Sequence, residues 1–316
     1  MKLFNFSIRN YAFLALAGIF LSFASCKKSS PSKPGSIYAT LAGNSNYSIL
    51  VAAVNKEGLK STLDQLGENK LTLFAPDNAA FMAAGINAGN LASIPDSTVK
   101  AILLYHVLPS QVESSQIPQA ANTAVATVNG QPVYATRTAA GAVYINGVPV
   151  TKANIMCTNG VIHQIPRVLM PAAGTIVQTA QGNSNLTLLV TAVLRASQGS
   201  TNVAGVLSSA GPFTVFAPTN QAFINAGFPT AESINAADPN TLASILTYHV
   251  IAGRIFSSDL VNGSMPATVN GEKVTVTTGQ SVQIKGTKNS TASNVTAADI
   301  VASNGVVHVI DQVLLP

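Results

Sequence analysis

Charge is scarce in this chain: only 9% of its 316 residues are Asp, Glu, Lys or Arg, against about 25% in typical soluble domains. Hydrophobic residues make up 47%, which excludes a largely disordered chain because ample apolar surface is available for burial. The formal charge of +5 includes Lys2 and Arg9, and without them it falls to +3. The remaining cations form no basic stripe, so we predict no nucleic-acid partner.

Cysteine and tryptophan are also rare, with two cysteines and no tryptophan. Cys157 lies in an apolar segment and is expected to be a buried, unreactive side chain. The missing tryptophan counts against a carbohydrate-stacking platform. No metal-ligand spacing, glycine-rich phosphate loop or nucleophile-elbow motif occurs. We therefore predict that the protein is not an enzyme and has no metal site and no cofactor.

The first 25 residues have the three parts of a secretory signal peptide: a positive start, an apolar run over residues 11–21, and small residues before Cys26. The apolar run is shorter than the ~20 residues of a transmembrane helix. A cysteine at the cleavage point predicts lipidation of Cys26, and residues 26–35 form a polar tether. We expect an exported protein, lipid-anchored to a bacterial cell envelope at the outer membrane. The alternative is a soluble periplasmic or secreted protein.

Most of the remaining chain is a duplication with an offset of 139 to 145 residues. Residues 153–171 match residues 298–316 without gaps, and 10 of the 19 positions are identical. A period this long indicates duplicated globular domains rather than a solenoid. We place the first copy at residues 36–171 and the second at 172–316.

Hydrophobic periodicity predicts helices first and strands last within each copy. In the first copy, an amphipathic helix begins near Asn44, a short strand covers residues 71–75, Asp77 caps a second helix, and a third begins at Asp96. The equivalent positions of the second copy are Asn183, residues 213–217, Thr219 and Asp238. Alternating segments follow, with Asn-Gly steps such as residues 146–147 that favour tight hairpins. This order predicts an α+β fold.

Three blocks in each copy resemble the fasciclin domain family. In the first copy they are Phe-Ala-Pro-Asp-Asn from residue 74, Tyr-His from residue 105, and Asn-Gly-Val-Ile-His from residue 159, the last followed by Val-Leu-Met-Pro. All three recur in order in the second copy. The resemblance implies two tandem fasciclin-like domains, each a β-sandwich wedge with helices along one edge. It also implies a role in adhesion or in cell-surface or matrix contact.

All four histidines lie inside repeated apolar blocks, without a second histidine, a cysteine or a carboxylate at ligand spacing. We therefore expect structural histidines, packed and hydrogen-bonded to backbone groups or to tyrosine.

The leading functional hypothesis is a lipid-anchored adhesion or binding protein whose partner is a cell-surface or matrix protein or a polysaccharide. The alternative is a structural spacer without a specific ligand. Asp299-Ile300 matches a step that the resemblance associates with adhesion, whereas the first copy has Asn154 in place of the acid. Candidate partner-binding residues are therefore Asp299 and Ile300, together with Tyr248 and His249, for which core packing is the alternative.

Overall fold

The computed structural model describes residues 34–64 and 70–316. Residues 34–316 form one compact unit. The predicted signal peptide and Cys26 lie outside the described residues, so both stay predictions. Among the described helices, none has the length and apolar character needed to cross a membrane.

Each copy contains a helical half followed by a strand-rich half, as the sequence predicts. The first copy comprises α1 (Ile37–Ala42), α2 (Ser48–Lys56), α3 (Lys60–Asp64), β1 (Leu71–Pro76), α4 (Asn78–Ala83), α5 (Asp96–Tyr105), β2 (Val107–Leu108), β3 (Thr123–Ala126), β4 (Pro132–Arg137), β5 (Val143–Ile145), β6 (Val148–Pro149), β7 (Lys152–Cys157) and β8 (Gly160–Ile165). The second comprises α6 (Ile176–Gln181), α7 (Thr187–Ala196), α8 (Val203–Ser208), β9 (Phe213–Pro218), α9 (Asn220–Asn225), α10 (Ala231–Ala236), α11 (Pro239–Tyr248), β10 (Val250–Ala252), β11 (Thr275–Thr277), β12 (Gln283–Lys285), β13 (Ser293–Ala302) and β14 (Gly305–Ile310).

Polar side chains begin the helices where the sequence places them. Asn44 accepts a hydrogen bond from the Asn46 N–H in the 3₁₀ turn before α2, and Asp77 accepts one from the Ala80 N–H in α4. Asp238 caps α11, whose first residue is Pro239. Each cap satisfies a backbone donor that has no partner within its helix, which is why these short helices start where they do.

The first and last strands of each copy pair in parallel at the centre of a sheet. The strand order is β2-β1-β8-β7 in the first copy and β10-β9-β14-β13-β12-β11 in the second, and β3-β4-β5-β6 form a further sheet. Gly160 and Gly305 begin the last strands where a Cβ would lie 2.0 and 2.1 Å from a carbonyl oxygen of the paired strand. The repeated Asn-Gly step therefore needs glycine for close strand approach.

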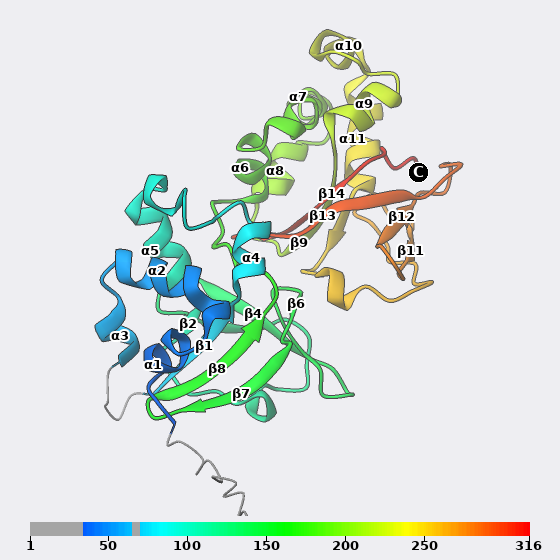
Figure 1. Ribbon diagram of the computed structural model, residues 1–316. Coiled ribbons are helices and arrows are strands. Elements are labelled where there is room, and N and C mark those ends of the chain that lie inside the picture. Colours follow the sequence, from blue (N-terminus) through cyan, green and yellow to red (C-terminus); the bar gives the residue numbers. More distant parts are fainter. Residues whose placement is uncertain (1–33, 65–69) are drawn as a thin grey trace, which may run out of the picture. The chain divides into compact units, whose positions relative to one another are not determined.

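Each copy has two apolar clusters, one on either side of its central strands. In the second copy, Val215 and Val307 belong to the cluster that packs against the helices, whereas Phe216 and Ile310 belong to the cluster on the strand-rich side. Figure 1 shows helices α6 to α11 gathered on one side of β9 and β14, with β11 and β12 on the other. The alternation of neighbouring residues between two faces produces this layering. The architecture is the predicted α+β fold in two tandem copies.

Candidate functional site

His106 and His249 occupy the same place in the two copies, at the C-terminal ends of α5 and α11. The His249 Nδ1–H donates to the Ile245 carbonyl oxygen at 2.8 Å, and Nε2 accepts the Leu314 N–H at 2.8 Å. His106 makes the equivalent bonds. Burial lowers the pKa of each histidine from 6.5 to about 4. Both rings are therefore neutral at neutral pH.

His163 and His308 form the second pair, in β8 and β14. The His308 Nε2–H donates to the Ile255 carbonyl oxygen at 2.9 Å, Nδ1 accepts the Asp299 N–H at 3.3 Å, and the ring stacks on Phe216. His163 is held in the same way. Burial lowers the pKa of both rings. The structural assignment of all four histidines is confirmed, since both ring nitrogens of each are occupied.

Tyr248, one of the candidate partner-binding residues, is fully buried. Its hydroxyl donates to the Lys273 carbonyl oxygen at 2.7 Å and accepts the Thr287 N–H at 3.1 Å. These bonds join the end of α11 to loops of the strand-rich half. Direct contact between Tyr248 and a partner would require this part of the domain to open.

Asp299 is also enclosed, although its charge suggests a surface position. Its side chain is 2% exposed and pairs with Arg167 at 2.8 Å, while Arg167 itself is 44% exposed. The carboxylate also accepts hydrogen bonds from the Ser257 N–H and hydroxyl. Ile300 is half-buried against the helical core and lines a hollow of about 330 Å³ together with Arg167 and Asp299. The two charges there neutralise each other, so neither offers a free ionic contact.

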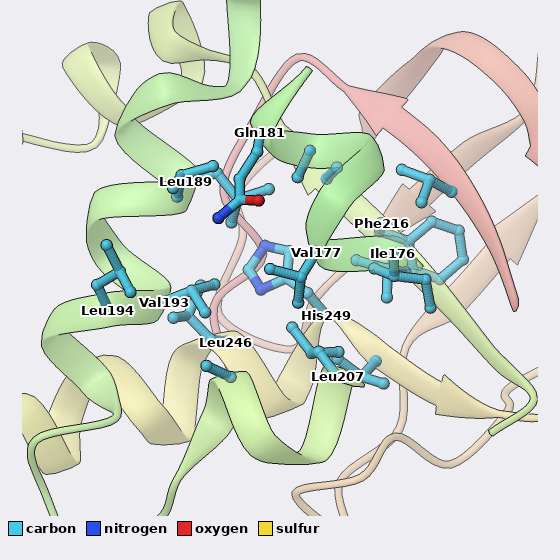
Figure 2. Close-up of a pocket in the computed structure, with 17 residues that line it drawn as sticks. Ile176, Val177, Gln181, Leu189, Val193, Leu194, Leu207, Phe216, Leu246 and His249 are labelled. Atoms are coloured by element: carbon cyan, nitrogen blue, oxygen red, sulfur yellow. The ribbon is translucent and has the colours of Figure 1, made fainter. Parts of the chain in front are cut away.

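A different feature of the second domain opens to the surface: an apolar pocket between α6, α7 and α8, with a volume of about 40 Å³. Its walls include Ile176, Val177, Ala180, Gln181, Leu189, Val190, Val193, Leu194, Ala204, Leu207 and His249. Figure 2 shows the side chains converging on the His249 ring at the floor, with Gln181 turned in from the edge. Leu194 on the rim is 56% exposed. Of the four predicted partner-binding residues, only His249 belongs to this pocket.

A buried asparagine holds two walls of the pocket in place. The Asn304 Oδ1 accepts the Ile176 N–H at 2.9 Å, and its Nδ2 donates to the Leu207 and Ser209 carbonyl oxygens, both at 2.8 Å. One side chain thus ties the start of α6 to the end of α8. Asn159 does the same for α1 and α3 in the first domain. The Asn of the repeated Asn-Gly block is therefore a clamp on paired helices.

The corresponding place in the first domain is closed. The Tyr38 hydroxyl donates to Asn55 Oδ1 at 2.8 Å, joining α1 to α2. The Lys60 ammonium lies 5.0 Å from the centre of the Tyr38 ring, a cation–π arrangement. Leu41 fills the space beneath and is completely buried. The hollow that remains measures about 10 Å³ and has no lining residue from α1.

Four substitutions between the copies account for the difference. With the helices aligned by their caps and by the asparagine clamps, the second domain carries Val177 for Tyr38, Leu194 for Asn55, Ala204 for Lys60 and Ala180 for Leu41. The three polar side chains that cover the hollow in the first domain are thereby replaced by apolar ones, and Leu41 is replaced by the smaller Ala180. The second domain has an apolar pocket of about 40 Å³ where the first has a hollow of about 10 Å³.

This pocket was not predicted from the sequence, because α6 and α8 have only six residues each and were not predicted either. One signal was present: Thr175 and Gln178 form a capping box at the start of α6. Comparison of residues 38–55 with residues 177–194 would then have shown that Tyr38 and Asn55 of the first copy are apolar residues in the second.

The described residues offer few groups for metal binding or nucleophilic chemistry. No cluster of three or more histidine, cysteine or acidic residues that could hold a metal occurs within residues 34–64 and 70–316. Burial raises the pKa of the Cys157 thiol, so it is a poor nucleophile, and it is buried as predicted. The pocket walls offer hydrocarbon, one neutral, fully hydrogen-bonded imidazole and the Gln181 amide at the edge. Fold and site together define a tandem α+β protein with an apolar pocket in its second domain.

The chain belongs to the fasciclin family, because the fasciclin domain matches it twice, at residues 45–171 and 184–316. It is 38% identical over 171 residues to protein sll1483 of Synechocystis, covering 54% of this chain and 89% of that protein. It is 34% identical over 141 residues to the immunogenic protein MPB70 of Mycobacterium bovis, covering 45% and 68%. Human periostin is 28% identical over 258 residues, which is 79% of this chain and 29% of periostin.

A solved structure of a FAS1 domain pair from the insect cell adhesion molecule Fasciclin I covers 88% of this chain and 96% of its own, at 19% identity and a TM-score of 0.42. Membership of the family, shown by the domain matches, is consistent with a non-enzymatic adhesion or binding role.

Proposed function

We propose that this protein is an exported adhesion or binding protein, lipid-anchored at Cys26 to the outer membrane of a bacterial cell envelope, and that its second domain contacts the partner. The observation that carries the proposal is the open apolar pocket of that domain, set against the closed counterpart in the first. Apolar pockets with an exposed rim are characteristic of binding surfaces.

The pocket favours a partner that presents a hydrocarbon group over a polysaccharide. A sugar ring needs several convergent hydrogen-bonding groups, whereas only Gln181 and the occupied His249 ring bring polar atoms to these walls. The alternative, a structural spacer without a ligand, does not explain why the two copies differ in this pocket.

Binding of residues 34–316 to envelope material from the producing organism tests the proposal. Ala180→Leu introduces the residue that closes the first domain, and it should abolish most binding. Asn55→Leu is the matched control, since it places a leucine at an exposed position of the first domain, and it should bind like the parent. If the parent itself does not bind, the spacer alternative is favoured. If Ala180→Leu binds like the parent, the pocket is not the contact.

Lipidation of Cys26 can be tested separately from partner binding. Because Cys26 follows a leader-like segment and precedes a polar tether, Cys26→Ser should move the full-length protein from the membrane fraction to the soluble fraction. Unchanged firm association with membranes would contradict lipidation.

A further inference from the structure

The pocket of the second domain has the size of a leucine side chain that the first domain supplies from within. In the first domain, Leu41 fills the equivalent space and is completely buried, whereas the second domain has Ala180 there. The void of about 40 Å³ holds roughly three carbon atoms at ~10–15 Å³ for each water-sized group, which matches the branched end of a leucine beyond its Cβ. An aromatic ring is too large, because a cavity that takes up benzene measures ~150 Å³.

The floor of the pocket accepts only an apolar group. Both ring nitrogens of His249 are bonded to backbone groups, and burial lowers the pKa of this histidine to about 4. The floor is therefore uncharged at neutral pH. A hydroxyl, amide or charged group placed against the ring would lose its water without gaining a partner. The pocket thus specifies one short aliphatic side chain.

An exposed leucine lies on the rim of the same pocket. Leu194 of α7 is 56% exposed, although Leu189 and Val193 on that helix are buried. Figure 2 shows Leu194 at the edge of the pocket, next to Val193. Single exposed leucines are common on protein surfaces, but this one is the kind of side chain that the void beside it accepts. The apolar surface of the pocket continues onto α7 at this residue.

The face around the pocket carries almost no charge. Arg195 is the only charged residue in α6, α7 and α8, and its Nε–H donates to the Ala237 carbonyl oxygen at 3.0 Å, outside the pocket lining. The equivalent helices of the first domain carry Lys56, Lys60 and Asp64. A surface that meets its own copy about a two-fold axis brings identical residues together, so like charges there would repel. The face of the second domain avoids this repulsion and offers no charge to a partner of opposite charge.

We infer that two copies of this chain associate through this pocket, with Leu194 of each copy inserted into the pocket of the other. The same contact is then made twice about a two-fold axis, because one patch carries both the void and the side chain that fills it. The inference rests on the proposed function, in which the pocket is the contact surface, and it names the partner as a second copy. The first domain cannot make this contact, because Leu41 fills its void and Asn55 stands at the position of Leu194.

Sedimentation equilibrium of residues 34–316 measures this association directly. The parent should form a dimer. Leu194→Asn removes both inserted leucines and should raise the dissociation constant at least about a hundredfold, since burying each leucine contributes about tenfold or more. Ala180→Leu should weaken the dimer as strongly, because it fills both pockets. Asn55→Leu is the matched control and should dimerise like the parent. Thermal melting by circular dichroism verifies that each variant is folded.

Mixing the two weakened variants distinguishes an inserted leucine from nonspecific apolar association. Leu194→Asn keeps the open pocket and Ala180→Leu keeps the rim leucine, so an equimolar mixture can form one of the two contacts. The mixture should associate with a dissociation constant between that of the parent and that of either variant alone.

A parent that stays monomeric at millimolar concentration would overturn the inference, as would a Leu194→Asn variant that dimerises like the parent or a mixture that associates no better than its components. Envelope material from cells that lack this protein should no longer bind residues 34–316. If it binds undiminished and Ala180→Leu abolishes that binding, the partner is a different molecule, so the dimer inference fails and the proposed function stands. If neither dimerisation nor envelope binding depends on Ala180, both fail.

Discussion

The two histidines at the helix ends should make each domain sensitive to acid. In the folded protein, the pKa of His249 is lowered from 6.5 to about 4 because the ring is buried and Nε2 must accept the Leu314 N–H. Between about pH 6.5 and 4, the unfolded chain therefore binds a proton at His249 that the folded chain does not bind. The resulting stabilisation is fully present above about pH 6.5 and is lost as the pH falls toward 4.

The size of the effect follows from the shift. Each pKa unit is a tenfold change in the protonation equilibrium, so the shift is equivalent to about 3 kcal/mol, of which about 2 kcal/mol is lost by pH 5. His249→Gln removes the titrating group. It should lower the free energy of unfolding of the second domain at pH 7.5 by roughly 1–3 kcal/mol and should reduce the loss between pH 7.5 and 4 by about 3 kcal/mol.

Urea unfolding of residues 34–316 at several pH values measures this, with far-UV circular dichroism as the signal because the chain has no tryptophan. Exposed carboxylates also titrate in this range, but they are common to parent and variant and cancel in the difference. His106→Gln is the matched variant of the first domain. It should reduce the pH dependence of the first domain's free energy of unfolding in the same way. A pH profile of His249→Gln that runs parallel to the parent's would refute the reasoning.

The remaining predictions concern packing and metal binding. Ala180→Leu should raise the stability of the second domain by about 1 kcal/mol, from a filled volume of about 40 Å³ at ~24 cal/mol per Å³, whereas Leu41→Ala should destabilise the first by roughly 3–5 kcal/mol; urea unfolding measures both. His308→Ala should destabilise the second domain by roughly 1–3 kcal/mol, because the Ile255 carbonyl oxygen and the Asp299 N–H lose their partner. Zinc or a chelator should leave the parent's melting temperature unchanged, and a clear rise with zinc would contradict the structural role of the histidines.

Local signals in the sequence were sufficient to predict most of the fold. The caps Asp77 and Asp238 and the hairpin at Asn146-Gly147 act through neighbouring backbone groups, so a single sequence reveals them. Duplication strengthened each signal by repeating it. The third helix of the first copy begins at Asp96 as predicted, with Pro95 in the position before it.

The pocket and the burial of Asp299 could not be predicted from the sequence, for two different reasons. Helices of six residues present less than two full turns, so α6 and α8 show no recognisable apolar stripe. Asp299 is buried by Ser257 and Arg167, which are 42 and 132 residues away in the chain. A charged residue in sequence is expected at the surface, and only tertiary contacts determine that this one is not.

The Asp299–Asn154 difference, which suggested that the second domain binds, also has a structural explanation. Both residues sit at an irregular turn of the backbone within the next-to-last strand of their copy, with φ of 65° and 57°, in the left-handed region that Asp and Asn tolerate best. Asn154 Oδ1 accepts the Ser114 N–H as Asp299 Oδ1 accepts the Ser257 N–H. The amide of Asn154 donates to the Ser114 hydroxyl, whereas Asp299 accepts from the Ser257 hydroxyl. The turn therefore needs the side-chain oxygen and not the charge.

Asp299→Asn should accordingly fold and keep the turn, losing the ion pair with Arg167 and reversing the hydrogen bond with the Ser257 hydroxyl, as in the Asn154–Ser114 pair. Because Arg167 is 44% exposed, solvent screens that pair, and its loss should cost no more than about 1 kcal/mol. Binding to envelope material then separates the two roles. A large loss of binding in a fully folded Asp299→Asn variant would assign Asp299 to the partner contact, as the family resemblance implies. Binding equal to the parent's would leave Asp299 as a turn residue and the partner contact with the apolar pocket.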